Sequence, residues 1–164
     1  MTSDWVDHEA SFEQVLGPLR GPACLLAVGA WLRTGFPDLR FVEQTMVGDD
    51  RHVISVMRLT GTNTGPLVRF RGGRVRSVVP PTGRRVDAPQ SHIYELRDGA
   101  VVSHAAVRDD LGLLTQLGLL PPAPSGLART AGWAVSGRSR RIAGEVVEKM
   151  RQAAAQLPDR RSVA

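Results

Sequence analysis

The most constraining feature of the sequence is residues 91–120, where a hairpin pattern leads directly into a helical one. The segment begins with β-favouring residues, turns at Asp98-Gly99 and returns through a mostly apolar stretch that ends near Val107. Asp-Gly between two such runs is a strong hairpin signal. Leucines then recur at helical spacing up to Leu120. The segment therefore predicts a strand, a tight turn, a second strand and a short helix.

Two aspartates, Asp109 and Asp110, lie where the second strand gives way to this helix. Either carboxylate can cap the helix by accepting a hydrogen bond from its first turn. Alternation along the strand makes Asp110 the better candidate for the cap. A carboxylate that pointed from here into a hollow sheet would instead suit acid–base chemistry. Both interpretations remain open for the pair.

The chain before this segment predicts one buried helix and one long hairpin. Residues 23–33 are apolar nearly all round, as in a buried helix, and Pro22 suits its first turn. Residues 39–47 and 51–60 predict two strands joined at a Gly-Asp-Asp turn, and the second alternates clearly.

A further hairpin is predicted at residues 68–79, where arginines alternate with apolar residues around a Gly-Gly turn. Its four arginines would share one face. That face is either solvated, a lid over a pocket mouth, or a contact with another protein. The arginines are Arg69, Arg71, Arg74 and Arg76.

After residue 120 the sequence changes character. A Pro-rich stretch predicts a linker, and residues 129–135 show no clear period. A helix is predicted over residues 139–156, capped by Ser136 or Ser139. Its apolar stripe needs a partner surface. The stripe consists of Ile142, Val146, Met150, Ala154 and Leu157.

Composition indicates one globular domain in a reducing compartment. The chain has 164 residues, 42% of them apolar, and no apolar run near the roughly 20 residues that span a membrane. The N-terminus lacks the features of a secretory signal. A single cysteine, Cys24, is typical of a cytoplasmic protein without disulfides.

The net charge of +5 comes from the C-terminal part of the chain. Residues 1–120 have 13 arginines and 13 acidic residues, whereas residues 121–164 have eight basic and three acidic ones. Only Trp133 interleaves with that basic tail, and no nucleic-acid motif is present, so nucleic acid is not an expected partner. Motifs for a serine hydrolase, a zinc protease or a nucleotide-binding loop are also absent.

Three stretches together resemble the SnoaL-like polyketide cyclases. Residues 98–118, DGAVVSHAAVRDDLGLLTQLG, are similar to the family's closing segment. GFPDLR at residues 35–40, and GTNTGP with PPTGRRV at residues 61–66 and 80–86, are similar to earlier motifs in the same order. The resemblance implies an α+β fold over residues 1–120: a cone-shaped, strongly curved, mostly antiparallel sheet closed by helices, as in nuclear transport factor 2.

The chain departs from that family at both ends. Typical members begin with one or two helices that cover the open side of the sheet, and this chain begins almost at the segment that follows them. It has an added C-terminal helix instead. We therefore expect residues 121–164 to form a linker and an amphipathic helix that fills the vacant position, in its own subunit or in a neighbouring one.

The resemblance implies a cyclase or isomerase of polyketide or related secondary-metabolite biosynthesis, without a metal or cofactor. By the family's pattern Asp109 is the general acid/base of an intramolecular aldol ring closure in an apolar pocket. His104 and His92 are its candidate partners, and Tyr94 could donate a hydrogen bond to a developing enolate oxygen. The alternative for Asp109 is an ion pair with a neighbouring arginine: Arg108, Arg58 or Arg84.

Substrate contacts are expected from Trp31, Phe36, Met57 and Asn63. The substrate would be small, apolar and polyketide-like, and the protein a homodimer or a higher even oligomer. Ala105 and Ser103 stand where the family often has tryptophan and glutamate. A hydrolase or dehydratase of the same fold, or a non-catalytic module that binds a ligand or partner, therefore stays an alternative.

Overall fold

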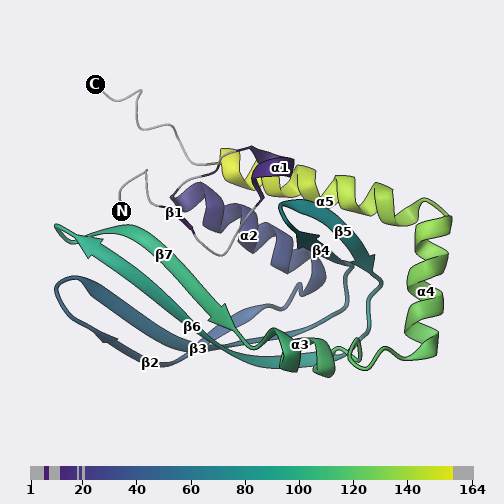
Figure 1. Cartoon of the computed structure of the whole chain (residues 1–164), viewed down its shortest axis with the longest axis horizontal. Coiled ribbons are helices and arrows are strands. Elements are labelled where there is room, and N and C mark those ends of the chain that lie inside the picture. Colours follow the sequence, from purple (N-terminus) through teal and green to yellow (C-terminus); the bar gives the residue numbers. More distant parts are fainter. Residues whose placement is uncertain (1–5, 8–11, 18, 20, 157–164) are drawn as a thin grey trace.

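The computed structural model describes residues 6–7, 12–17, 19 and 21–156 of the chain (Figure 1). Within these residues short elements at the N-terminus precede a long helix, a set of strands and three further helices. In chain order they are β1 (Val6–Asp7), α1 (Glu13–Leu16), α2 (Pro22–Gly35), β2 (Arg40–Gly48), β3 (His52–Thr62), β4 (Leu67–Arg71), β5 (Arg74–Val79), β6 (Arg85–Arg97), β7 (Ala100–Arg108), α3 (Asp110–Gln116), α4 (Pro124–Val135) and α5 (Arg138–Ala155).

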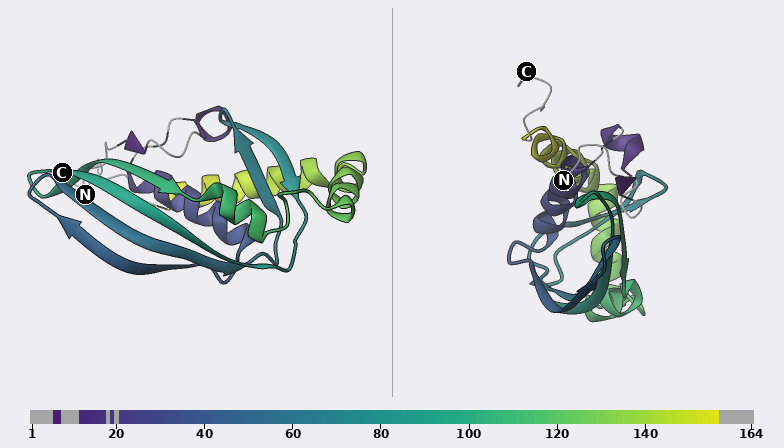
Figure 2. Two further views of the ribbon diagram at one scale, coloured as in Figure 1. Left: turned by 60° about the horizontal axis from the view of Figure 1, so that its bottom comes forward. Right: turned by 90° about the vertical axis from the view of Figure 1, so that its left-hand side faces the viewer.

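The main sheet has five strands in the order β1-β7-β6-β3-β2. The short β1 runs parallel to β7, and the other neighbours are antiparallel. Seen end-on, the sheet curves strongly, with α2 lying along one side (Figure 2). The expected α+β class, with a curved and mostly antiparallel sheet and a C-terminal helix, is therefore confirmed.

The segment at residues 91–120 folds as its pattern predicts. Strands β6 and β7 pair antiparallel on either side of a two-residue turn, with one shift in register between Glu95 and Leu96. Both turn residues, Asp98 and Gly99, have positive φ angles, of 53° and 72°. A turn of this kind matches the twist of the two strands, and Asp and Gly tolerate that backbone best.

The arginine-rich hairpin is also confirmed. Strands β4 and β5 pair as a separate two-stranded sheet that turns at Gly72-Gly73. A shift in register between Arg69 and Phe70 marks a bulge in the hairpin. The hairpin projects from the main sheet near α2 and α5 (Figure 1).

Two groups of buried apolar side chains hold the fold together, with α2 between them. The first, here the sheet cluster, packs α2 and α3 onto the sheet, and the second, the C-terminal cluster, packs α2 and the β4–β5 hairpin onto α5. The sheet cluster consists of Leu32, Phe36, Leu39, Leu59, Leu67, Val79, Val86, Ala88, Leu113 and Leu117. The C-terminal cluster consists of Phe12, Ala27, Val68, Val78, Ile142, Ala143, Val146 and Met150.

The C-terminal part differs in one respect from the prediction. Residues expected to form a linker and an aperiodic stretch instead form α4, a helix with proline at its first turn and no buried residue. The next helix, α5, follows Gly137, whose φ is 73°, and no side chain caps it, so the cap expected from Ser136 or Ser139 is wrong.

Helix α5 buries Ile142, Val146 and Met150 from the expected stripe. Leu157, the last residue of that stripe, lies outside the described residues. In Figure 1 α2 lies between α5 and the main sheet. Whether α5 stands in for the family's N-terminal helices stays a prediction. None of the helices in the described part of the chain has an apolar stretch that could cross a lipid bilayer.

Candidate active site

A cavity of about 390 Å³ lies between α2, α3, the β4–β5 hairpin and the inner face of the sheet. Most of its wall is apolar, and the helices and the sheet both contribute to it. Polar groups reach it from three places: Gln90 and Arg108 on the sheet, Asp110 at the start of α3, and Arg69 and Arg71 on β4. The apolar wall includes Val28, Trp31, Leu32, Phe36, Leu59 and Leu113.

Trp31 joins the helix wall of this cavity to the hairpin wall. Its indole Nε1–H donates a hydrogen bond of 2.7 Å to the Val68 carbonyl. Its ring also meets Phe12 and Phe70 edge to face, with centroids 5.6 and 5.7 Å away. Phe12 and Phe70 themselves lie 4.9 Å apart in the same arrangement. Edge-to-face aromatic contacts are favourable beyond their buried area, so the hairpin is fixed against α2.

The carboxylate that lines the cavity is that of Asp110. Its Oδ1 accepts a hydrogen bond of 2.7 Å from Arg108 Nε. The Arg108 side chain is 16% exposed and that of Asp110 is 65% exposed, so the aspartate lies towards the solvent side of the pair. The ion pair therefore brings a carboxylate and a guanidinium group to one edge of an apolar cavity.

Asp109 takes the capping role that alternation assigned to its neighbour. Its Oδ1 accepts a hydrogen bond of 2.8 Å from the Gly112 N–H, and the residue is exposed. The expectation that Asp110 would cap is thus wrong. The reason is local: the chain leaves the extended conformation at Asp109, where φ is −71° and ψ is 79°, so strand alternation no longer decides where the side chain points.

The arginines considered as ion-pair partners of Asp109 interact elsewhere. Arg108 pairs with Asp110, and Arg58 pairs with Asp87. Arg84 donates to the Gln116 carbonyl at 3.5 Å. Asp109 is not among the residues that line the cavity, and its part in catalysis stays a prediction.

The other three predicted catalytic residues lie together on the inner face of the sheet. Tyr94 is opposite His104 in register, and the rings of these two residues stack with centroids 4.9 Å apart. His92 Nδ1 is 2.9 Å from His104 Nε2, and its Nε2 is 2.8 Å from Gln90 Nε2. Gln90 in turn lines the cavity. A hydrogen-bonded row therefore leads from the cavity wall to a pair of histidines.

The hydrogen bond between the two imidazoles limits the charge of the pair. It needs one ring nitrogen with a proton and one without, so His92 and His104 cannot both be fully protonated while it exists. His104 is only 2% exposed. In the described part of the chain no group of three or more His, Cys, Asp or Glu side chains could hold a metal ion.

Of the four residues expected to contact substrate, Trp31 and Phe36 line the cavity. Met57 does not, although it lies opposite Gln90 on the inner face. Asn63 has a different task. Its amide donates to the carbonyls of Gly35 and Gly65 at 3.0 and 2.9 Å.

The Asn63 carbonyl oxygen also accepts two hydrogen bonds, from the backbone N–H and the hydroxyl of Thr82, at 2.9 and 3.0 Å. Together the four bonds use both donors and both lone pairs of the amide. Asn63 therefore joins two turns to the end of α2. A contact between Asn63 and substrate stays a prediction.

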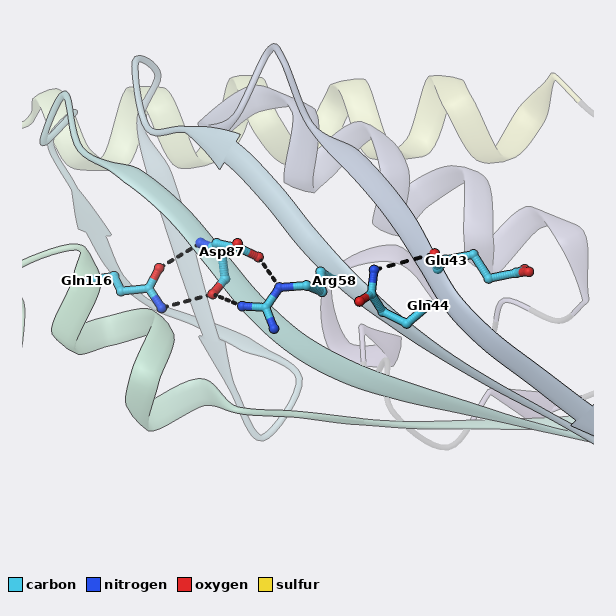
Figure 3. A network of polar contacts seen from close by, with 5 residues as sticks. All are labelled: Glu43, Gln44, Arg58, Asp87 and Gln116. Atoms are coloured by element: carbon cyan, nitrogen blue, oxygen red, sulfur yellow. Dashed lines mark hydrogen bonds and ion pairs between the residues drawn. The ribbon is translucent and has the colours of Figure 1, made fainter.

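A polar network on the other side of the sheet holds α3 in place (Figure 3). The Gln116 side chain accepts from the Asp87 N–H at 2.6 Å and donates to the Asp87 carbonyl at 3.0 Å, as a strand neighbour would. The Asp87 carboxylate also pairs with Arg58 Nε at 2.6 Å. The exposed ion pair adds little stability by itself. The backbone-like bonds of Gln116, however, fix the helix that carries Asp110.

The curved sheet, its helices and the mostly apolar cavity between them define a class of proteins, the fold of nuclear transport factor 2. Within that class, a sequence profile described as SnoaL-like polyketide cyclase matches residues 1–117, so the chain belongs to this family. The family resemblance expected from the motifs is thus confirmed.

Particular relatives agree with this assignment. The chain is 32% identical over 111 residues to aklanonic acid methyl ester cyclase DauD from Streptomyces sp. (strain C5), a match over 66% of this chain and 62% of DauD. It is 31% identical over 109 residues to aklanonic acid methyl ester cyclase DnrD from Streptomyces peucetius, over 66% of this chain and 69% of DnrD. The chain thus spans less than two thirds of DauD.

A solved structure supports the fold. The crystal structure of a proposed SnoaL-like polyketide cyclase from Jannaschia sp. CCS1 superposes with a TM-score of 0.54 at 28% identity. The match covers 76% of this chain and 74% of the other. The last helices of the present chain lie beyond the 117 residues that match the family profile.

Proposed function

We propose that the protein is a cyclase that closes a ring in a polyketide-like substrate by an intramolecular aldol reaction. The observation that carries this proposal is the mostly apolar cavity of about 390 Å³ with a carboxylate at its edge. Its volume lies within the range of roughly 300–1,000 Å³ that is usual for small-molecule sites. Membership of the cyclase family and the names of two relatives support the same reaction class.

An aldol ring closure needs one group to take a proton from the carbon beside a carbonyl and to return a proton to the oxygen formed. A carboxylate can do both in turn. Asp110 lines the cavity, whereas the family's pattern implies Asp109 one residue earlier. The cavity geometry favours Asp110, and the two residues can be separated by substitution.

The oxygen that becomes negative during the reaction needs hydrogen-bond donors. Gln90 and Arg108 both line the cavity and carry N–H groups. The histidine pair hydrogen-bonds to Gln90 from behind and so would orient its amide. In this proposal His92 and His104 are positioning residues, with Tyr94 stacked on His104.

The decisive experiment is a ring-closure assay with aklanonic acid methyl ester, comparing wild type with Asp110→Asn and Asp109→Asn. General acid–base groups contribute about 10²- to 10⁴-fold, so we expect Asp110→Asn to lower kcat by at least about 100-fold. Asparagine caps helices as well as aspartate does, so Asp109→Asn preserves α3.

A loss of activity confined to Asp109→Asn would assign the acid/base role to Asp109. Activity in both variants would refute carboxylate catalysis at this junction. A wild-type protein that binds the ester without converting it would instead be the ligand-binding module considered as an alternative.

We also propose a homodimer formed through the outer face of the sheet. Five large apolar side chains on that face are exposed, which is unusual for a monomer's surface. Replacing Ile54 by glutamate is then expected to give a monomer by light scattering, and a wild-type monomer at micromolar concentration would refute the dimer. The five side chains are Val42, Val47, Ile54, Ile93 and Val107.

We propose a cytoplasmic location because the chain has a single cysteine.

A further inference from the structure

We infer that the β4–β5 hairpin makes this cavity selective for ligands that carry an oxyanion, above all a carboxylate attached to an apolar ring body. The inference rests on the proposed function, because it concerns the substrate class of the same cavity. It begins from two arginines, Arg69 and Arg71, that line the cavity from β4.

The two arginines are the uncompensated charges of the cavity wall. Its aspartate, Asp110, is paired with Arg108. Neither Arg69 nor Arg71 forms an ion pair with a carboxylate within the described residues. The cavity wall therefore carries an excess of positive charge beside its apolar surface.

Some arginines of the described chain pair with carboxylates, and others, including Arg76 and Arg97, do not. Arg58 pairs with Asp87, Arg141 with Glu145, and Arg151 with Glu148. Arg74, the next arginine of the hairpin, donates to the side chain of Gln14. Among the described residues, Arg69 and Arg71 have no carboxylate partner and also lie in the cavity wall.

The hairpin that presents these arginines is held rigidly. Val68, one residue before Arg69, is fully buried and accepts the Trp31 hydrogen bond through its carbonyl. Phe70, which lies between the two arginines, packs edge to face against Phe12 and Trp31. The backbone is thus fixed on both sides of Arg69, and a ligand does not have to order it.

Arginine suits this task better than lysine would. The planar guanidinium donates two parallel hydrogen bonds to a carboxylate or a phosphate. An apolar ring system would fill the space between Trp31 and Leu59, and its anionic group would lie at the hairpin. Arginines that only interact with solvent do not need a cavity beside them. The place of Arg69 and Arg71 in the cavity wall therefore favours recognition of a ligand.

The test is isothermal titration calorimetry of the full chain with anthraquinone-2-carboxylic acid and with its methyl ester. These probes share a flat apolar body and differ in one charge. We expect wild type to bind the acid about tenfold more tightly than the ester, the factor that a single charge-assisted contact commonly gives. Added salt should weaken binding of the acid and leave binding of the ester unchanged.

The double variant Arg69→Gln, Arg71→Gln should lose the preference for the acid and keep its affinity for the ester, which also shows that the hairpin is intact. Arg97→Gln is the matched control. It removes a charge of the same kind from the exposed end of β6, far along the sheet from the cavity, and should change neither affinity. Competition with inorganic phosphate distinguishes a general oxyanion site from one restricted to carboxylates on a ring body.

Equal binding of acid and ester by wild type would overturn the inference. So would failure of both to bind, or an Arg97→Gln effect as large as that of the double variant. None of these results decides the proposed ring closure, because that assay uses an ester and reads product formation.

Discussion

The two apolar clusters on either side of α2 differ in where their residues come from. The sheet cluster lies wholly within the residues that match the family profile. The C-terminal cluster combines Val68 and Val78 of the hairpin with side chains of α5, which lies beyond that match. Trp31 and Val28 pack against both.

This difference shows how a segment outside the family match can support the cavity. Helix α5 does not line the cavity itself. It packs behind α2 and the β4–β5 hairpin, and the hairpin provides one wall of the cavity. Residues absent from the family match therefore support the wall that carries Arg69 and Arg71. The predictions below test how strongly the two clusters depend on one another.

The largest effect is expected from Met150→Ala in the C-terminal cluster. Met150 is fully buried, and truncation of such a side chain to alanine costs about 2–5 kcal/mol through lost burial and the cavity left behind. We expect urea unfolding to remain one transition, because α2 belongs to both clusters. Two separate transitions, one for each cluster, would contradict the dependence of the sheet on α5.

The control for this variant is Leu127→Ala on the neighbouring helix. Leu127 is 55% exposed, and α4 buries no residue. Substitutions at such positions usually change stability by no more than about 0.5 kcal/mol. A cost comparable to that of Met150→Ala would show that α4 packs against something other than its own chain.

Trp31→Phe should have the next largest effect, since it removes one link between the clusters without removing the aromatic ring. The loss of the 2.7 Å hydrogen bond leaves the Val68 carbonyl without its donor and costs about 1–2 kcal/mol. Hydrogen exchange of the amides in β4 and β5 should accelerate more than exchange in β3 and β6. Equal acceleration in all four strands would mean that Trp31 supports the fold generally, not the hairpin.

Sequence alone located the parts of the fold that short patterns determine. Asp98-Gly99 and Gly72-Gly73 each have positive φ at both turn positions, which is why these dipeptides predicted the hairpins correctly. Helix α4 was missed for the opposite reason. Only a narrow, half-buried face of α4, with Trp133, packs against the C-terminal cluster, so the helix has no broad apolar stripe to reveal it. Gly126 and Gly132 lower its helical propensity further.

The candidate site was harder to predict. Alternation along β6 and β7 places Gln90 with His92, and Arg108 with His104, on one face, so both could have been proposed from the sequence. Nothing in the sequence shows which stretch of that face a hairpin and a helix enclose. At the end of β7 alternation stops being a guide: Asp109 caps α3, and Asp110 lines the cavity.

Asp109→Ala tests the helix cap directly. Removal of an N-cap side chain costs about 1 kcal/mol, whereas asparagine caps as well as aspartate. We therefore expect the melting temperature to fall in Asp109→Ala and to stay unchanged in Asp109→Asn. Equal melting temperatures for the alanine and asparagine variants would contradict the cap. Because asparagine preserves the cap, only its effect on ring closure bears on catalysis.

The smallest effect concerns Asp38, in the loop between α2 and β2 beside the sheet cluster. Its carboxylate accepts hydrogen bonds from the Thr62 N–H at 2.7 Å and the Thr62 hydroxyl at 2.9 Å. These bonds, the backbone one first, lower the pKa of Asp38 below its ordinary value of 3.8. Since the folded state favours the charged form, the stabilisation is present above the ordinary pKa and disappears as the pH falls through the lowered one.

Asp38→Asn should therefore lower the melting temperature slightly at neutral pH, and the difference from wild type should vanish in acid as the pH falls through the lowered pKa. The measurement is thermal unfolding of both proteins across that range of pH. A difference that stays constant in acid would mean that asparagine disturbs the loop by its shape, not by its missing charge. Because the described members of the C-terminal cluster are all uncharged, acid should weaken the Asp38 contact on the sheet side first, and Met150→Ala should keep its full cost at the same pH.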